Sequence, residues 1–336
     1  MTAAHDGARR AGAPTTRVGI VVINWNGWRD TLDCIASLRG LRYPNWHAFV
    51  VDNASTDDSV ERLHDLGTDA TLVRSPVNAG WAGGNNLGIR AALAAGCDCV
   101  WLVNNDVTVT PESLGRLVAA QARHAADYGF FGCLVEYVEP SDWYQYAATR
   151  VDPTYGLPEK CAVPRAQVDV DAELIDVHYV YGCALFVHRD VIDDIGLIDE
   201  RFYLNYDETD WCYRGAAAGW KSAIVNGAVV GHQGSASIGG GDSPLNQYFM
   251  TRNALLFIEK HAPRAQLRHL LVDRIKETYW AARSERGRFW PIALLRPRDI
   301  GLRIRRLAVR DYLLRRFGDC PAVVRRLQRE ARAALA

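Results

Sequence analysis

The chain has 336 residues, of which 49% are hydrophobic and 23% are charged. This length suits two domains, or one large α/β domain with an appendage, and the composition is that of a globular protein with a sizeable core. No apolar run reaches the roughly 18 residues of a membrane-spanning helix, and the first 17 residues lack the apolar segment of a secretory signal. These features predict a cytoplasmic chain. Its eight scattered cysteines form no CxxC pair, so we expect free thiols rather than a zinc site.

The formal net charge is zero, but the charges are unevenly distributed. Residues 264–336 contain 19 Lys and Arg against seven Asp and Glu, a balance of +12, and the residues before them carry the opposite balance. Such a split predicts an anionic partner for the basic tail and a cation for the acidic body. Packing of the tail onto the acidic body is the alternative.

Strands and helices alternate through the first part of the chain. Residues 1–16 are rich in Ala, Gly and Thr, and we expect them to be disordered. The apolar, β-branched run at 18–23 indicates a strand buried on both faces, which is typical of a parallel sheet. Further strands are expected at 46–51, 70–73 and 99–103, and helices at 28–38, 57–66, 85–95 and from Pro111, as the first helical residue, to about Ala125. This alternation predicts a doubly wound, Rossmann-like and mostly parallel sheet, whose ligands bind at the carboxyl ends of the strands.

The second part of the chain is less periodic. Residues 136–176 are rich in Tyr and Trp and are predicted to form an inserted hairpin beside the cleft. After them we expect a strand at 177–188, a helix from about Asp207 to Gly219, a short strand at 228–230 and a helix at 245–261 that Pro263 ends. Residues 239–242 are expected to form a flexible loop that acts as a lid.

Asn, Asp and Gly follow each of the first four predicted strands. The segments are NWNG at 24–27, DNASTD at 52–57, NAGWAGGNN at 78–86 and NND at 104–106. Turn formation would explain one of these segments, but four of them along one edge of a sheet predict a single shared polar site.

Two carboxylates in these segments are candidates for nucleotide binding. Asp106 follows a buried strand, where a carboxylate is costly unless it is paired or binds a cation, so it is a candidate ligand for Mg²⁺ or Mn²⁺ together with a diphosphate. Asn104 or Asn105 would then bond ribose, and an Asx turn is the alternative for this segment. Asp52 is a candidate acceptor for a base N–H or for ribose hydroxyls, with a turn cap as its alternative.

The segment 80–88 opens a helix and contains four glycines, which suits the approach of a phosphate to the backbone. It lacks both the GxGxxG spacing after the first strand and the GxxxxGK[ST] motif, which excludes a P-loop and argues against a dinucleotide site.

A group of acids marks the later half of the chain. Asp207, Glu208 and Asp210 lie within four residues, and like charges this close raise one another's pKa, as a general base requires. The acidic first turn of a helix is the alternative. His232 is a candidate contact for a metal or a phosphate, and a structural histidine is its alternative.

Together these segments resemble a known family. Seven pieces stand in the order of a family-two glycosyltransferase of the GT-A fold, in its rhamnosyltransferase-like branch. They are VVINWNG (21–27), VVDNASTDDS (50–59), NAGWAGGNNLGI (78–89), WLVNNDV (101–107), YGCALFVHRDVIDDIGLIDERFYLNYDETDWCYR (181–214), HQGSAS (232–237) and YFMTRNALLFIEKH (248–261). The resemblance covers residues 17–262. It implies a nucleotide-binding half at 17–135, an acceptor half at 136–262 and a basic, amphipathic helical extension at 263–336.

The resemblance also implies roles for individual residues. Asn24 and Asp52 would hold the base, and Asn78, Gly80 and Asn85 would line the nucleotide pocket. Asn104-Asn105-Asp106 stands in the place of the family's DxD metal motif, with Asp106 as the main ligand and His232 as a metal or diphosphate contact. The base belongs to an acidic pair that is reversed here, so Glu208 takes its position with Asp207 as the alternative. Asp210, Trp211 and Arg214 of the same segment are expected to bind substrate.

The implied activity is inverting transfer of a sugar, with rhamnose as a candidate, from a dTDP- or UDP-sugar to a hydroxyl acceptor. The acceptor would be a polysaccharide, a lipid-linked intermediate or a small molecule, and the cofactor Mg²⁺ or Mn²⁺. A sugar-phosphate nucleotidyltransferase and a non-catalytic nucleotide-sugar-binding module are the alternatives. For residues 264–336, the interleaved Arg and apolar residues predict association with an anionic membrane surface, on the inner face of the cell membrane. We expect no nucleic acid partner, because no nucleic-acid-binding motif occurs.

Overall fold

A computed structural model describes residues 16–139, 141–152, 154–169, 171–233, 243–286 and 299–333. The expected disorder at 1–15 and the expected lid at 239–242 lie outside these residues. The strands are β1 (Val18–Asn24), β2 (Trp46–Asp52), β3 (Ala70–Arg74), β4 (Cys99–Asn104), β5 (Val107–Val109), β6 (Tyr128–Tyr137), β7 (Trp143–Val151), β8 (Pro158–Pro164), β9 (Leu174–Val177), β10 (Ala184–His188) and β11 (Lys221–His232). The helices are α1 (Trp28–Leu38), α2 (Ser59–Arg62), α3 (Gly80–Ala94), α4 (Ser113–His124), α5 (Arg189–Ile195), α6 (Asp207–Ala217), α7 (Pro244–His261), α8 (Arg264–Arg286), α10 (Ile300–Leu313) and α11 (Ala322–Ala333).

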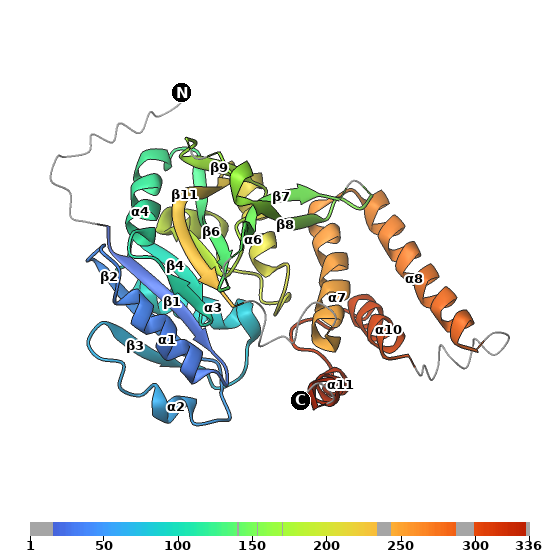
Figure 1. The fold of residues 1–336 in the computed structure, drawn as a ribbon. Coiled ribbons are helices and arrows are strands. Elements are labelled where there is room, and N and C mark those ends of the chain that lie inside the picture. Colours follow the sequence, from blue (N-terminus) through green and yellow to red (C-terminus); the bar gives the residue numbers. More distant parts are fainter. Residues whose placement is uncertain are drawn as a thin grey trace.

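One mixed sheet forms the centre of the molecule (Figure 1). Its main path runs β3-β2-β1-β4-β10-β6-β11-β5, and β3, β2, β1 and β4 are mutually parallel. This confirms the predicted doubly wound architecture. β10 enters antiparallel between β4 and β6, and β11 then runs parallel to β6. Because β1 lies between β2 and β4, the polar ends of these three strands meet at one edge of the sheet.

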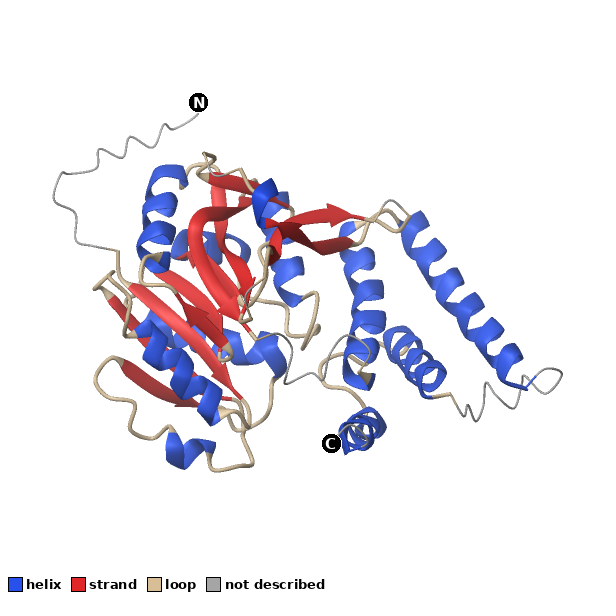
Figure 2. Ribbon diagram, viewed as in Figure 1, coloured by secondary structure: helices blue, strands red, loops and turns tan. Residues whose placement is uncertain are grey.

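Helices cover both faces of the sheet, as Figure 2 shows. Successive residues of a strand point to opposite faces, so Ile20 and Val22 of β1 pack with α1 and α4, whereas Val21 packs with α3, α5 and α6. This two-sided burial explains the uninterrupted apolar run at 18–23.

Beyond the sheet, α7, α8, α10 and α11 gather at the C-terminal side (Figure 1). The apolar residues Ile304 and Leu307 of α10, with Val324 of α11, pack against α7. Within the described residues, no helix is both long enough and apolar enough to cross a membrane.

The insertion at 136–176 contains the expected hairpin. β7 and β8 pair antiparallel, and β7 also pairs with the end of β6. All eight cysteines are free, as predicted, and seven of them are buried.

Several predicted boundaries are wrong for physical reasons. The helix expected at 57–66 is only Ser59–Arg62, because the chain leaves the helical conformation at Leu63, whose N–H still bonds the Ser59 carbonyl. α4 begins at Ser113 rather than Pro111, because the Ser113 N–H closes a turn onto the Thr110 carbonyl. The short strand expected at 228–230 is the end of the longer β11.

The strand expected at 177–188 is two strands, β9 and β10, with an irregular segment between them. In that segment a Cβ on Gly182 would lie 2.8 Å from the Trp81 ring, so the chain passes this ring closely. This irregular segment therefore lies next to Trp81 at the start of α3.

Candidate active site

The end of β1 positions the end of β2 through buried side chains. The Asn24 amide donates to Asp52 Oδ1 at 3.0 Å and to Ser55 Oγ at 3.0 Å, and Asn24 Oδ1 accepts from the Thr31 hydroxyl at 2.9 Å. Both the nitrogen and the oxygen of the Asn24 carboxamide are therefore hydrogen-bonded to groups of the protein. Its contacts hold the Asp52 carboxylate in place at the strand end, where both residues are buried.

The loop before α3 is held by Asn53, a residue that the sequence analysis did not select. Its amide donates to the Gly80 carbonyl at 3.0 Å and to Asn78 Oδ1 at 3.2 Å, and its Oδ1 accepts from the Ala79 N–H at 3.0 Å. The Asn53 carboxamide thus supplies hydrogen-bond partners to the backbone of this loop. Its only sequence signal was its position next to Asp52.

Gly80 must be glycine in this loop. Its φ is 71°, and a Cβ would lie 2.3 Å from the Tyr203 carbonyl oxygen. The same carbonyl accepts the Trp81 N–H at 2.7 Å, and the Tyr203 hydroxyl donates to Asn78 Oδ1 at 3.0 Å. Asn78 Oδ1 also accepts the Gly80 N–H at 2.9 Å, which satisfies a free donor at the helix start. This explains why α3 begins at Gly80, five residues before the predicted start.

The end of β4 is fixed on both sides. Asn104 Oδ1 accepts from the Trp81 indole at 3.0 Å, and the Asn105 amide donates to the Thr31 hydroxyl at 3.2 Å. Thr31 in turn bonds Asn24, so hydrogen bonds run continuously from Asp52 to Asn105. The structure thereby brings the three predicted strand ends into one network.

Asp106 and His232 come together at the turn between β4 and β5. β5 pairs with the end of β11, which places His232 opposite Val107. His232 Nε2 lies 3.4 Å from Asp106 Oδ1, and its Nδ1 lies 2.7 Å from Gln145 Oε1 of β7. Since a carboxamide oxygen only accepts, Nδ1 carries the proton and Nε2 is left to face Asp106.

This pair fits a hard divalent cation. The Asp106 side chain is 12% exposed and His232 is buried, so the pair borders solvent on one side only. Among the described residues no group of three or more His, Cys, Asp or Glu could hold a metal ion. A site with one carboxylate and one imidazole suits Mg²⁺ or Mn²⁺ that takes its other ligands from a diphosphate and water.

α6 begins with the acidic pair, of which Asp207 is the buried member. Asp207 is 2% exposed, and its Oδ2 has no hydrogen-bond partner. Burial, followed by the charge and hydrogen bonding of Glu208, raises the pKa of Asp207 well above its usual value. Burial therefore favours the protonated form of the Asp207 carboxyl over its charged form.

Glu208 points to the irregular segment between β9 and β10. A Cβ on Gly182 would lie 3.4 Å from the Glu208 carboxyl carbon and 2.8 Å from Trp81. Burial raises the pKa of both Tyr181 and Cys183, and the charges of Asp106 and Glu208 raise these pKa values further. The Tyr181 ring lies against the His232 ring, with centroids 5.9 Å apart, so this segment contacts the Asp106–His232 pair at Tyr181 and lies close to Glu208 at Gly182.

A strained turn sets the start of α6. Tyr203, Asn205 and Tyr206 all have φ between 66° and 67°, which costs a non-glycine residue about 1 kcal/mol each. Asn253 of α7 offsets this cost by donating to the carbonyls of Phe202, Leu204 and Asn205 at 2.8, 2.8 and 2.9 Å. The buried Arg252 guanidinium donates to the Phe202 carbonyl as well. In the sequence, Arg252 and Asn253 stood out only as members of the family motif at 248–261.

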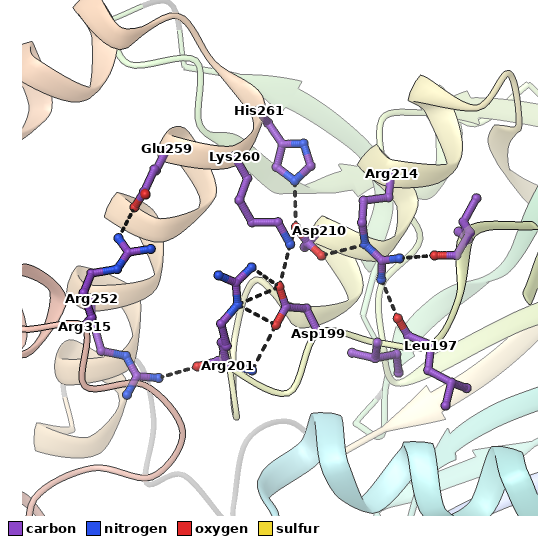
Figure 3. Close-up of polar contacts among 12 residues, drawn as sticks. Leu197, Asp199, Arg201, Asp210, Arg214, Arg252, Glu259, Lys260, His261 and Arg315 are labelled. Carbon is purple, nitrogen blue, oxygen red and sulfur yellow. Dashed lines mark hydrogen bonds and ion pairs between the residues drawn. The ribbon is translucent and has the colours of Figure 1, made fainter.

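The expectation that Asp210, Trp211 and Arg214 bind substrate is corrected by the structure. Figure 3 shows Asp210 between Arg214 on one side and Lys260 and His261 on the other, at 3.0, 2.6 and 2.7 Å. Burial acts to raise the pKa of Asp210, but these partners outweigh it and lower the pKa. Arg214 also donates to the Ile195 and Leu197 carbonyls, and the buried Trp211 indole donates to Gly196. Arg214 and Trp211 thus anchor α6 to the end of α5 and the loop after it, and Asp210 anchors α6 to the end of α7.

Asn85 requires a second correction. It is buried, and its amide donates to the Trp81 carbonyl one turn earlier in α3, so it stabilises the helix instead of lining the pocket. The neighbouring Asn86 connects α3 to the segment before α6, through bonds to the Ile198 carbonyl at 2.9 Å and the Ile198 N–H at 3.0 Å.

Fold and site together define a class of protein. The buried Asp52 and the Asp106–His232 pair lie at the ends of neighbouring strands of a doubly wound sheet, which is where such sheets bind their ligands. The family model described as "Glycosyl transferase family 2" matches residues 19–196, more than half of the chain. The chain belongs to this family.

Curated relatives and solved structures agree with this assignment. The chain is 24% identical over 251 residues to "dTDP-rhamnosyl transferase RfbF" of Shigella flexneri, covering 72% of this chain and 80% of that protein. It is 22% identical to "Low-salt glycan biosynthesis hexosyltransferase Agl10" of Haloferax volcanii, over 59% of this chain and 61% of the relative.

Among solved structures, GalNAc-T7 with UDP, GalNAc and Mn²⁺ matches with a TM-score of 0.55 at 15% identity, covering 74% of this chain and 54% of that one. The mannosyltransferase PcManGT from Pyrobaculum calidifontis, in complex with GDP-Man and Mn²⁺, matches with a TM-score of 0.52 at 14% identity and covers 91% of both chains. Both likenesses support the GT-A fold.

Proposed function

We propose that the protein is an inverting glycosyltransferase that depends on a divalent cation and uses a dTDP- or UDP-sugar, with dTDP-rhamnose as the first donor to test. The observation that carries this proposal is that one short segment lies beside both groups: the Tyr181 ring centroid is 5.9 Å from that of His232 in the Asp106–His232 pair, and the next residue, Gly182, lies close to the Glu208 carboxyl. The name of the RfbF relative supports dTDP-rhamnose, and the Mn²⁺ complexes of the two similar structures support the cation.

The donor half of the site is formed by the ends of β1, β2 and β4. The Asp52 carboxylate, held by Asn24, would accept the imide N–H of a pyrimidine base, and the Asn78 loop would line the nucleotide pocket. Asn104 and Asn105 would bond ribose in this proposal, in addition to the protein groups that each already bonds.

Asp106 Oδ1 and His232 Nε2 would hold Mg²⁺ or Mn²⁺. When bound, the cation would neutralise negative charge that develops on the leaving diphosphate. Gln145 fixes which His232 nitrogen faces the cation, as the outer partners of metal-ligating histidines do.

Glu208 is the proposed general base. Its carboxylate takes the proton of the acceptor hydroxyl as that oxygen forms a bond to the anomeric carbon. The bond from this carbon to the diphosphate oxygen breaks on the opposite face, so the nucleoside diphosphate departs and configuration inverts. Asp207 is not the base in this proposal, since its carboxyl is buried whereas Glu208 is partly exposed.

The acceptor is a hydroxyl of a polysaccharide, a lipid-linked intermediate or a small molecule. The β7–β8 hairpin stands beside this half of the site, and its Lys160 amine lies 3.2 Å from the Tyr181 hydroxyl. Lys160 also lies 4.4 Å from the centre of the Tyr181 ring, so a cation borders the space into which Glu208 points.

The test is release of nucleoside diphosphate from dTDP-rhamnose, UDP-glucose and related donors, with Mn²⁺ and with chelator. Asp106→Ala and Glu208→Gln should each lower kcat by about a hundredfold or more. Glu61→Gln, at an exposed site on α2, is the matched control and should leave kcat unchanged. Undiminished turnover in both site variants would overturn the residue assignment, and no release from any donor would overturn the proposed donor class.

A further inference from the structure

The basic extension uses most of its apolar surface within the protein. In α10 the residues Ile304, Leu307, Ala308 and Tyr312 are buried, and in α11 Val324 and Leu327 are buried with them. Their clusters include residues of α7, so the helices pack on the body. The apolar stripes that the sequence offered to a membrane are largely occupied by this packing.

Among the described residues of the extension, several exposed apolar side chains form a groove. α8 and α10 form the walls of a groove of about 560 Å³, whose lining atoms are almost all apolar. Ile275, Leu313 and Leu314 line it with 52%, 54% and 55% of their surface exposed. Val309 lies between them, and Arg306 and Arg310 complete the wall on the α10 side. Exposed large apolar residues grouped in this way mark a contact surface.

Among the described residues, most ion pairs made by basic side chains of the extension are with acids of the extension itself. Within the described part of the chain, Arg274, Lys276, Arg310 and Arg325 pair with acids of the extension itself: Glu277, Asp273, Asp311 and Asp319. Arg315 pairs with Glu259 of α7 and so reaches beyond the extension. Because residues 264–336 hold 19 basic and seven acidic residues, the extension carries an excess of positive charge that would attract an anionic partner.

We propose that the groove between α8 and α10 is a docking site for an anionic phospholipid bilayer. Leu313, Leu314 and Ile275 would enter the acyl boundary, while Arg306 and Arg310 would contact lipid phosphates. A bilayer matches both features at once, because it offers apolar chains under a layer of negative charge. A second copy of the chain would instead place the same arginines against one another.

The sequence predicted membrane association for the whole of residues 264–336, whereas the proposed docking site is one groove between α8 and α10. This site does not depend on which donor sugar the protein uses. The groove is also linked to the catalytic half. At the tip of the β7–β8 hairpin, Tyr155 donates to Asp273 of α8 at 3.1 Å, and the same hairpin carries Gln145 beside His232. Docking through α8 would therefore hold the hairpin near the bilayer surface, where an acceptor on a lipid carrier would lie.

The test is co-sedimentation of the full chain with vesicles of phosphatidylcholine containing about one third phosphatidylglycerol, against pure phosphatidylcholine. We expect binding to the anionic vesicles only, weakened by added salt. The double variant Leu313→Ser/Leu314→Ser should lower the partition coefficient by roughly thirtyfold, and Arg306→Gln by several-fold. Val138→Ser, which removes an apolar side chain that is 58% exposed on the body, is the control and should not change it.

Each outcome decides the proposal. Failure of the wild type to sediment, or unchanged binding by a folded Leu313→Ser/Leu314→Ser variant, overturns it. Self-association that this variant abolishes would assign the groove to a second copy, and salt-sensitive binding to RNA without vesicle binding would assign the charge to nucleic acid. If the double variant melts below the wild type, Ile275→Ser on α8 provides the same test from the opposite wall. Diphosphate release with a soluble acceptor should persist in all these variants, so failure here is distinct from failure of the proposed transferase activity.

Discussion

Replacement of Asp207 by Asn should stabilise the protein more as the pH rises. Asp207 is 2% exposed, and burial together with Glu208 raises its pKa well above the usual 3.8. A carboxyl whose pKa is raised by folding contributes stability that is complete below the unfolded-state pKa and is lost as the pH rises through the folded-state value. Asn has no proton to lose, so the variant escapes this loss.

The size of the effect follows from proton linkage. Between about pH 4 and the raised pKa, the wild type should lose about 1.4 kcal/mol per pH unit relative to Asp207→Asn. For a chain of this size that difference corresponds to roughly 3 °C in Tm per pH unit. Thermal unfolding of both proteins at pH 5, 6 and 7 measures it directly.

Asp199→Asn is the matched control. Burial acts to raise the pKa of Asp199, but its bonds to Arg201 and Lys260 outweigh burial and lower it. The contribution of Asp199 is then complete above about pH 4, so this variant should be less stable than the wild type by an amount that does not change from pH 5 to 7. A difference between Asp207→Asn and the wild type that is constant or shrinks over this range would refute a neutral, buried Asp207.

Four further predictions concern the supports of the site. Gly80→Ala should lower the free energy of unfolding by roughly 2–4 kcal/mol, because its Cβ would meet the Tyr203 carbonyl at 2.3 Å, whereas Gly96→Ala, which has φ of 80° but open space around it, should cost about 1 kcal/mol. Asn253→Ala should cost about 3 kcal/mol by freeing three carbonyls in the turn before α6 and should lower kcat as well; an unchanged urea midpoint would show that the turn does not need it. Arg325→Ala removes a 2.8 Å bond to the Tyr203 hydroxyl, which in turn bonds Asn78 of the loop before α3. The variant should bind UDP or dTDP several-fold more weakly when measured by calorimetry. Arg326→Ala, on the same helix, should not change this binding. Gln145→Leu should lower the affinity for Mn²⁺ about tenfold, because His232 loses the hydrogen-bond partner of its Nδ1. The affinity is measured from the spectrum of free Mn²⁺. Equal affinities of wild type and variant would show that Gln145 does not support the proposed metal site.

Much of the nucleotide half was readable from the sequence because its signals are local. The run at 18–23 predicted a strand buried on both faces, and the sheet places helices on both. The polar residues after β1, β2 and β4 were expected to share one site, and parallel pairing brings them together at one sheet edge. The alternation of strands and helices predicts this arrangement, because neighbouring parallel strands end at the same edge of the sheet.

The errors came from contacts between distant parts of the chain. Asp210, Trp211 and Arg214 lie in the same acidic segment as Glu208, and nothing in their spacing shows which side of α6 meets the core. The loop after α5 and the end of α7 decide this by binding all three. Asn53 and Asn253 had no distinctive signal, because their function is to bond carbonyls that only the folded chain places nearby.

The sequence by itself determined the alternation of strands and helices, the polar strand ends and the basic extension, because each depends on residues close together in the chain. The tertiary structure alone decided that His232 meets Asp106, that Asp207 is buried while Glu208 is partly exposed, and that an apolar groove is exposed among the described residues of the extension. The physical reason is burial. Whether a carboxylate is ionised or a leucine is free to meet a lipid depends on what covers it, and its sequence neighbours do not determine that.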